Sequence, residues 1–261
     1  MIDSHCHIYP EKIAARAVGG TDNFYGVISF CKGTVEDLLE RGKSAGIDKF
    51  VVQSVATTAK QVESINRFIA DEAEKSSGKL IGLGTMYPDT DKLEEDFELI
   101  LDLGLKGIKL HPDIQGFKID DYRCLKIYEM CEKNGLPVLI HTGDSRYDNS
   151  NPNRLIPILE IYSNITVIGA HFGGYSIWND ACSQLKKYPN LFVDCSSSFP
   201  WLEKDNAKRL IYEYGPDKVL FGTDYPMWNP VTEIETLTSL GLSESELKKI
   251  FSLNAEKVFD I

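Results

Sequence analysis

Short apolar runs alternate with amphipathic stretches along almost the whole chain. The runs are rich in Val, Ile and Leu and nearly continuous in apolar character, which is typical of strands buried on both faces of a parallel sheet. The runs are Ile2–His7, Lys49–Val55, Leu80–Met86, Gly107–His111, Pro137–His141, Ile165–His171, Leu191–Cys195 and Val219–Thr223. The pattern predicts a series of parallel strands separated by helices.

The stretches between these runs carry the spacing of amphipathic helices. Thr34 is the expected N-cap of one helix, with Asp37 three residues later in a variant of the capping box. Apolar residues three to four positions apart predict further helices around Val62, Ile65 and Ile69, around Leu93, Phe97, Ile100 and Leu101, and over Glu244–Phe259.

Strands and helices alternating over 261 residues fit an α/β fold of the (β/α)8 type, a TIM barrel. The competing arrangement is an open doubly wound sheet, which would gather polar residues at one switch point rather than after many strands. No Pro/Gly/Ser-rich linker interrupts the pattern, so residues 1–261 are expected to form a single domain. The longest stretch without a clear pattern, Tyr9–Gly33, is expected to be irregular and to fold over the mouth of the barrel.

The composition narrows the range of partners. The formal net charge is -11, which argues against nucleic acid or an anionic membrane as a partner but leaves a small anionic substrate open. No apolar run is long enough to span a membrane, and the N-terminus lacks the pattern of a signal peptide. The six cysteines form no CxxC pair, so we expect reduced thiols in a cytoplasmic protein.

Histidine is used in a restricted way. All five histidines end predicted strands: His5, His7, His111, His141 and His171. In a barrel these ends form the active-site face. His5 and His7 are two residues apart, so both imidazoles point to the same side of their strand and can share one metal. Such a pair alone is more often a set of strand-end residues bonded to loops, but the histidines on other strands favour a metal site.

Two charged residues extend this set. Asp224 ends the last run, where a buried carboxylate is costly without a cation beside it, although it could also be a turn residue. Imidazole and carboxylate ligands together suit Zn, Mn or Fe and leave a position open for water. Lys109 shares a face with His111 and would point into the barrel, to bind a substrate carboxylate or to carry a carbamate that bridges two metals. Alternatively, Lys109 pairs with Asp224 or Asp194.

Loops after the strands supply further candidates for substrate contacts. We select Arg146 and Trp228 as substrate-binding residues together with Lys109 and His111. The other loop candidates are Tyr147, Arg154, Phe199, Trp201 and Tyr225. For each of these loop residues, Arg146 and Trp228 included, simple packing of the loop is the favoured alternative.

As an ordered set, the segments MIDSHCHI, GIKLHP, LIHTG, GAHFGG, LFGTDYP and LNAEKVFDI resemble the amidohydrolase superfamily, specifically its amidohydrolase-related (amidohydrolase 2) branch of TIM barrels. The resemblance spans the chain from the first strand to the last helix. It implies one divalent metal, with zinc favoured, held by His5, His7, His141 and Asp224. It also gives His171 a catalytic role, or makes it a ligand of a second metal together with a carboxylated Lys109.

The resemblance implies a metal-dependent hydrolase acting on an amide, lactone or other ester bond of a small molecule. A metal-activated water would attack the bond, Asp224 would accept and return a proton, and His171 or the metal itself would polarise the carbonyl. The branch also contains nonoxidative decarboxylases of aromatic or muconate-like acids, which is the first alternative. The second alternative is a catalytically silent barrel that binds a metal or a ligand. A homodimer is compatible with the sequence.

Overall fold

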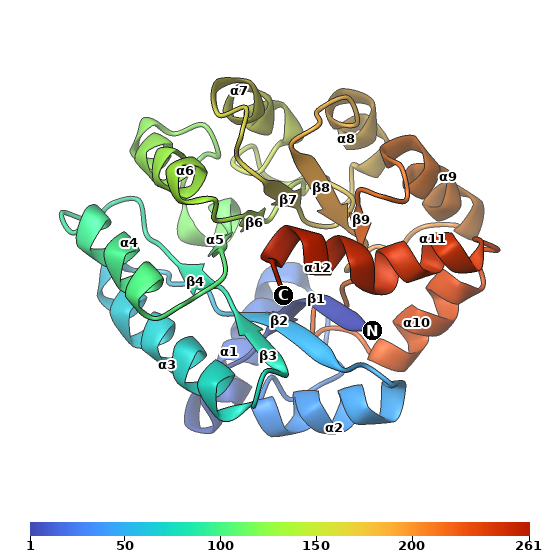
Figure 1. The fold of residues 1–261 in the computed structure, drawn as a ribbon, viewed down its shortest axis with the longest axis horizontal. Coiled ribbons are helices and arrows are strands. Elements are labelled where there is room, and N and C mark those ends of the chain that lie inside the picture. The colour runs from blue at the N-terminus through green and yellow to red at the C-terminus, as the bar shows by residue number, and fades with distance from the viewer.

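The strands form a ring in the order of the chain (Figure 1). The computed structural model describes residues 1–261. The strands are β1 (Ile2–His7), β2 (Lys49–Gln53), β3 (Leu80–Gly82), β4 (Gly84–Thr85), β5 (Ile108–Leu110), β6 (Val138–Ile140), β7 (Val167–Gly169), β8 (Leu191–Asp194) and β9 (Val219–Leu220). One sheet holds β1 to β3, the other holds β4 to β9, and every neighbouring pair is parallel.

Hydrogen bonds join the two sheets on both sides. β3 and β4 are two parts of one predicted strand, and the N–H of Lys106, just before β5, donates to the carbonyl of Gly82 in β3 at 2.8 Å. On the other side, the N–H of Ser4 in β1 donates to the carbonyl of Phe221, just after β9, at 2.8 Å. The ring of strands is therefore that of the predicted TIM barrel, and the open sheet is excluded.

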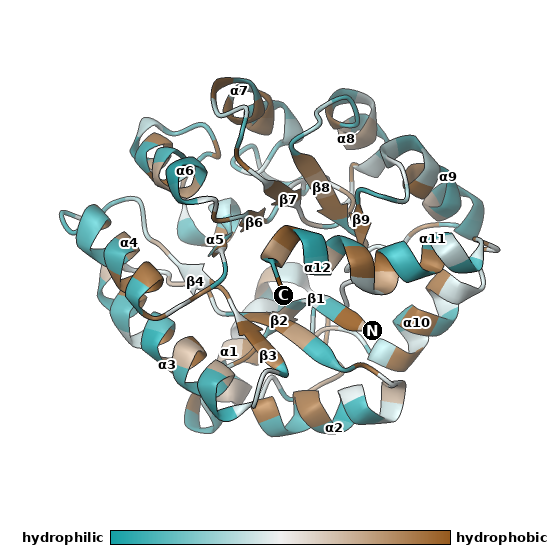
Figure 2. Ribbon diagram, in the orientation of Figure 1, coloured by the Kyte–Doolittle hydropathy of each residue, from teal (hydrophilic) through white to brown (hydrophobic).

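Helices surround the ring, with hydrophobic residues toward the strands and hydrophilic residues outward (Figure 2). They are α1 (Glu11–Tyr25), α2 (Val35–Ala45), α3 (Val62–Lys75), α4 (Leu93–Asp102), α5 (Pro112–Gln115), α6 (Tyr122–Asn134), α7 (Leu155–Ile161), α8 (Trp178–Leu185), α9 (Lys204–Tyr214), α10 (Pro230–Thr238), α11 (Glu244–Lys248) and α12 (Asn254–Phe259). None of them has both the length and the apolar character needed to cross a membrane. All six cysteines are buried with free thiols.

Helix α2 has the predicted N-cap at Thr34 but not the predicted capping box with Asp37. The Thr34 side chain accepts from the backbone N–H of Asp37 at 3.3 Å, as an N-cap should. The Asp37 carboxylate does not turn back to Thr34, so the predicted capping box is wrong. It accepts instead from the N–H of Lys32 and from the hydroxyl of Tyr225, because those donors lie beside it.

The last helix closes one end of the barrel. In Figure 1, α12 crosses the end nearest the viewer, where the strands begin. Ala255 and Phe259 of α12 pack against apolar side chains inside the barrel, including Val51 and Leu139. A π-helical turn, Lys249–Leu253, interrupts the predicted helix Glu244–Phe259 between α11 and α12. The opposite end, where the strands finish, is left for polar side chains.

The prediction that Tyr9–Gly33 is irregular is wrong, because α1 occupies Glu11–Tyr25. The adjacent Gly19 and Gly20 and the polar run after them give this segment a weak intrinsic helix propensity. Packing overrides that propensity, since Ala14 and Val18 are buried one turn apart on the inner face. The segment does cover the mouth of the barrel, because α1 lines the cavity described below.

Replacing Gly19 with Ala is expected to stabilise the protein by about 0.5–1 kcal/mol. A Cβ at this position meets no atom within 4 Å, and the substitution removes the glycine penalty from a helix interior. Thermal unfolding should show a melting temperature higher by about 1–4 °C. The matched control is Gly82→Ala, whose Cβ would lie 2.7 Å from Leu105, so it should lower the melting temperature. A destabilised Gly19→Ala variant would contradict the helical assignment.

Candidate active site

A cavity of about 740 Å³ opens where the strands end. Its wall consists of strand-end residues, one face of α1 and the start of α3. The predicted residues that it brings together are His5, His7, Lys109, His111, His141, His171 and Asp224. The barrel thus unites residues that are distant in sequence.

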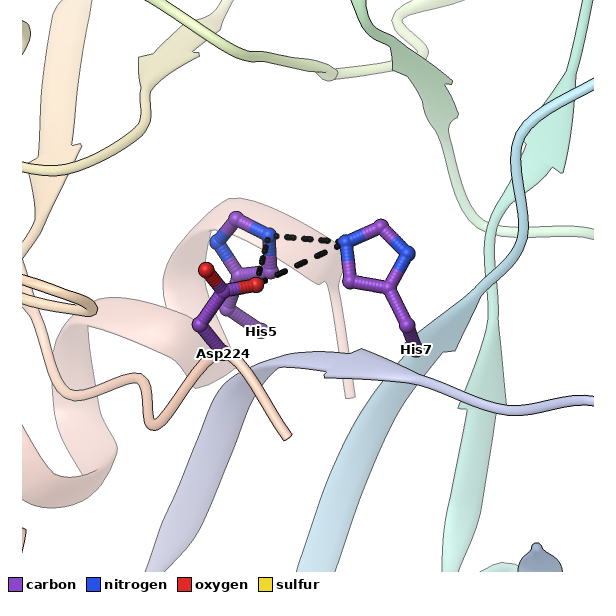
Figure 3. A group of neighbouring side chains, drawn as sticks. All are labelled: His5, His7 and Asp224. Carbon is purple, nitrogen blue, oxygen red and sulfur yellow. Dashed lines mark hydrogen bonds and ion pairs between the residues drawn. The ribbon is translucent and has the colours of Figure 1, made fainter. Parts of the chain in front are cut away.

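Three side chains converge as the ligands of a metal would (Figure 3). The Nε2 atoms of His5 and His7 are 3.2 Å apart, and they lie 3.4 and 3.6 Å from Oδ1 of Asp224. A tetrahedral ion about 2.1 Å from each ligand would separate the ligand atoms by about 3.4 Å. The donor set of two imidazole nitrogens and one carboxylate oxygen therefore fits a divalent transition metal in both spacing and chemistry.

Asp194 at the end of β8 orients the first of these ligands. Its Oδ2 lies 2.9 Å from Nδ1 of His5, so Nδ1 carries the proton and Nε2 keeps the lone pair with which it would bind a metal. Its Oδ1 accepts from the backbone N–H groups of His171 and Ser196, each at 3.0 Å. Burial opposes ionisation of Asp194, but the neighbouring imidazoles of His5 and His171 and the side-chain hydrogen bonds from His5 and Ser196 hold its pKa below the ordinary value.

Asp224 is also ionised. Burial raises its pKa, but the nearby imidazoles of His5, His171 and His7 and a hydrogen bond from Ser197 have the larger combined effect and lower it. The Ser197 hydroxyl donates to Oδ2 at 2.6 Å, which leaves Oδ1 facing the histidines. Asp224 therefore presents a fixed negative charge to a bound metal.

His141 and His171 lie beside the converging trio. Nδ1 of His141 is 3.1 Å from Nε2 of His171, and Nε2 of His141 is 3.6 Å from Oδ2 of Asp113 with no hydrogen-bond partner. His141, predicted as a metal ligand, therefore lies outside the group formed by His5, His7 and Asp224. His171 holds its Nδ1 3.0 Å from the carbonyl of Ser196, so that nitrogen carries the proton.

The backbone at two of these residues is strained. His171 has φ of 59° and Asp224 has φ of 56°, both in the left-handed region that side chains other than glycine rarely adopt. Such conformations cost on the order of 1 kcal/mol each and gather at functional sites. The strain accompanies the two residues predicted to be catalytic.

Burial in the cavity favours the neutral form of four of its imidazoles. Burial, followed by the charge of Lys109, lowers the pKa values of His7 and His111 well below the ordinary value. Burial also lowers the pKa values of His141 and His171. Neutral imidazoles can act as metal ligands and as proton acceptors.

Lys109 places a cation on the floor of this cavity. Its Nζ is fully buried, lies 3.0 Å from Nε2 of His5, and forms no ion pair with Asp224 or Asp194. The alternative in which Lys109 pairs with one of those carboxylates is therefore not what the structure shows. Burial lowers the pKa of Lys109 to about 8, so the ammonium form still predominates at neutral pH.

Two of the predicted substrate contacts lie outside the lining of the cavity. The Arg146 guanidinium binds the Asp144 carboxylate at 2.7 Å and the carbonyl of Phe24 at 2.8 Å. The Trp228 indole N–H donates to the Ser197 hydroxyl at 2.8 Å, so Trp228 reaches Asp224 only through Ser197. Both side chains therefore pack against neighbouring loops, which is the alternative given above for these residues.

Sequence reasoning missed the contribution of α1. The Tyr25 hydroxyl lies 2.8 Å from Nε2 of His111, and Lys12 and Arg16 line the cavity farther along the helix. The spacing of four residues between Lys12 and Arg16 could have indicated that both side chains lie on one face, but only if the segment is helical. Asp194 was considered only as a partner of Lys109, although its place at a strand end matched that of the histidines.

A smaller pocket of about 330 Å³ lies next to the cavity and contains a carboxylate in an unfavourable environment. Glu233 on α10 is 2% exposed, and its Oε2 has no hydrogen-bond partner. Burial, with the charges of Asp3 and Asp224, raises the pKa of Glu233 to about 8. Glu233 is therefore mostly protonated at neutral pH in the folded protein.

Replacing Glu233 with Gln is expected to stabilise the protein at neutral pH. The folded-state pKa is raised, so the stability that the protonated form provides is complete below the ordinary pKa of 4.5 and is lost as pH rises toward about 8. The loss amounts to on the order of 3 kcal/mol at pH 7. Denaturant unfolding at pH 5 and pH 8 should show a larger gain for the variant at pH 8. Equal gains at both values, or a similar gain from the exposed control Glu235→Gln, would contradict this account.

Comparisons with known proteins agree with this architecture. The model of the Amidohydrolase family matches residues 2–261. The 2-amino-3-carboxymuconate-6-semialdehyde decarboxylase of Dictyostelium discoideum is 25% identical in an alignment of 202 residues, and the match covers 62% of this chain and 55% of that protein. The chain therefore spans about half the length of the curated relative that it matches.

Solved structures share the whole fold. An uncharacterised TIM-barrel protein from Bordetella bronchiseptica has a TM-score of 0.83 at 22% identity, over 100% of this chain and 98% of that one. A dihydroxybenzoic acid decarboxylase from Polaromonas sp. JS666, with bound manganese and the inhibitor 2-nitroresorcinol, has a TM-score of 0.75 at 17% identity, over 99% and 96% of the two chains. With the family match over nearly its full length, the chain belongs to the Amidohydrolase family of TIM-barrel proteins.

Proposed function

We propose that this protein is a metal-dependent nonoxidative decarboxylase of a small organic acid. The curated relative and the manganese-bound structural neighbour are both decarboxylases by name. These likenesses favour decarboxylation, the alternative of the sequence analysis, over the hydrolysis that was its main prediction. They also make manganese a candidate beside the predicted zinc.

The charge of the cavity is the observation that carries the proposal. Among the lining residues, Lys12, Arg16 and Lys109 are basic and only Asp224 is acidic. The chain as a whole has a net charge of -11, so the cavity departs from the average of the protein. A cavity that is more positive than its surroundings attracts and retains anions. A carboxylic acid is the anionic small molecule on which a decarboxylase acts.

Decarboxylation requires a group that stabilises developing negative charge and a group that delivers a proton. A divalent metal held by His5, His7 and Asp224 would supply Lewis-acid stabilisation of that charge. Lys109, buried beside His5, adds a fixed positive charge in a water-poor setting, where it acts more strongly than at the surface.

His171 is the candidate proton carrier. Departure of carbon dioxide leaves an electron pair on the substrate carbon, and one proton must reach that carbon. The Ser196 carbonyl holds the Nδ1 proton of His171, so Nε2 is the atom at which a further proton is held or moved. The lowered pKa of His171 makes its protonated form a stronger acid, which favours transfer to carbon.

A paired substrate screen tests this function. Aromatic and unsaturated carboxylic acids would be incubated with manganese-loaded and zinc-loaded protein beside their methyl esters, amides and lactones. Release of carbon dioxide from at least one acid, without hydrolysis of the matched compounds, is the expected result. Hydrolysis without carbon dioxide release would restore the hydrolase prediction, and bound metal with no turnover of any compound would favour the silent barrel.

A further inference from the structure

One face of α1 carries two cations at the mouth of the cavity. Lys12 and Arg16 are four residues apart, so they lie on the same side of the helix. Both line the cavity, and both are exposed, unlike Lys109 at its floor. The cavity therefore has positive charge at two depths.

Neither cation has a partner within the protein. Lys12 and Arg16 take part in no ion pair, and their side chains form no hydrogen bond, whereas Arg41 and Arg67 pair with acidic residues one turn away on their own helices. Like charges four residues apart destabilise a helix by about 0.2–0.5 kcal/mol. The chain has 39 acidic and 28 basic residues, so carboxylates are plentiful, yet none lies against this pair. The pair is thus an uncompensated positive site that faces the cavity.

The wall beside these cations is largely apolar. The apolar lining residues from α1, α3, α5 and the loops after strands are Ile13, Ala17, Phe24, Val55, Ile65, Phe68, Ile114 and Met227. An anion bound at Lys109 would therefore have apolar surface around the part of the molecule nearer the mouth. Ligand sites commonly combine such walls with a few placed polar groups.

We infer that Lys12 and Arg16 form a rim site for a second anionic group of the substrate, remote from the carboxylate that is lost. The substrate class is then a diacid whose two anionic groups are separated by an apolar segment. This inference rests on the proposed function in taking the substrate to be an acid. The two cations attract the remote group, the apolar wall covers the segment between, and Lys109 receives the other end.

Binding of nonreacting diacids tests the rim site without relying on turnover. Isophthalate, terephthalate and biphenyl-4,4′-dicarboxylate would be titrated calorimetrically into manganese-loaded protein beside benzoate and biphenyl-4-carboxylate. At least one diacid should bind ten times more tightly than its matched monoacid. In the Lys12→Gln/Arg16→Gln double variant this preference should disappear while monoacid affinity stays the same.

The control is the Lys43→Gln/Lys204→Gln double variant, which removes two charges from exposed positions on α2 and α9 outside the cavity lining. This control variant should keep the diacid preference. The comparison therefore separates the effect of removing two positive charges anywhere on the protein from the effect of removing Lys12 and Arg16. Equal affinity for diacids and monoacids in the wild-type protein, or a preference that survives in the Lys12/Arg16 variant, would overturn the inference. A diacid preference without decarboxylation of any acid would support the rim site and count against the proposed function alone.

Discussion

Replacing Asp224 with Asn is expected to lower kcat by at least about a thousandfold while the barrel remains folded. The substitution preserves size but removes the negative charge that faces His5 and His7 at 3.4 and 3.6 Å. The remaining ligands would bind a divalent metal more weakly, and the balance of charge around Lys109 would change. Turnover, metal content and circular dichroism of the purified variant should be measured together.

Asp217→Asn provides the matched control for this variant. Asp217 is an exposed aspartate that pairs with Lys249 away from the cavity, so its replacement should leave turnover and metal content unchanged. An Asp224→Asn protein with near-normal turnover would contradict both the metal site and the role assigned to this carboxylate.

Replacing Asp194 with Asn is expected to weaken metal binding by about 10–100-fold. Every contact to this carboxylate comes from a donor: the Nδ1–H of His5, the backbone N–H groups of His171 and Ser196, and the Ser196 hydroxyl. An amide has one accepting oxygen, so its NH2 group must face one set of these donors. Either His5 loses its orientation, or two buried N–H groups lose their acceptor.

Activity of Asp194→Asn should recover in part as the concentration of Mn²⁺ is raised, because this residue positions a ligand rather than binding the metal in the trio. The unfolding free energy should fall by about 1–3 kcal/mol, the penalty for unsatisfied buried donors. A variant with normal metal affinity, or one whose loss of activity no metal concentration relieves, would show that Asp194 does not act through His5.

The barrel and the strand-end residues of the candidate active site follow from local rules. Strands buried on both faces read as continuous apolar runs, and residues at the ends of parallel strands meet at one face, so the convergence of His5, His7 and Asp224 was predictable. Asp194 was harder to interpret, because its partner His5 is 189 positions away and only the closed ring brings them together.

Two features depended on packing that sequence patterns do not express. The helix α1 contains Gly19 and Gly20, and its stability comes from burial of one face against the barrel rather than from propensity. Arg146 and Trp228 lie in loops, where charge and aromatic character do not determine whether a side chain faces the cavity or a neighbouring loop. The Arg146 guanidinium donates to the carboxylate of Asp144, two residues away, and the Trp228 indole N–H donates to the hydroxyl of Ser197.

The most direct test of the account is decarboxylation followed in D2O with an acid labelled with ¹³C at its carboxyl group. Metal-loaded protein should release labelled carbon dioxide and leave one deuterium on the carbon that carried the carboxylate, and removal of the metal with a chelator should stop both until Mn²⁺ or Zn²⁺ is restored. Labelled carbon dioxide released at the same rate by the chelated protein, or hydrolysis products that retain the label, would contradict metal-dependent decarboxylation.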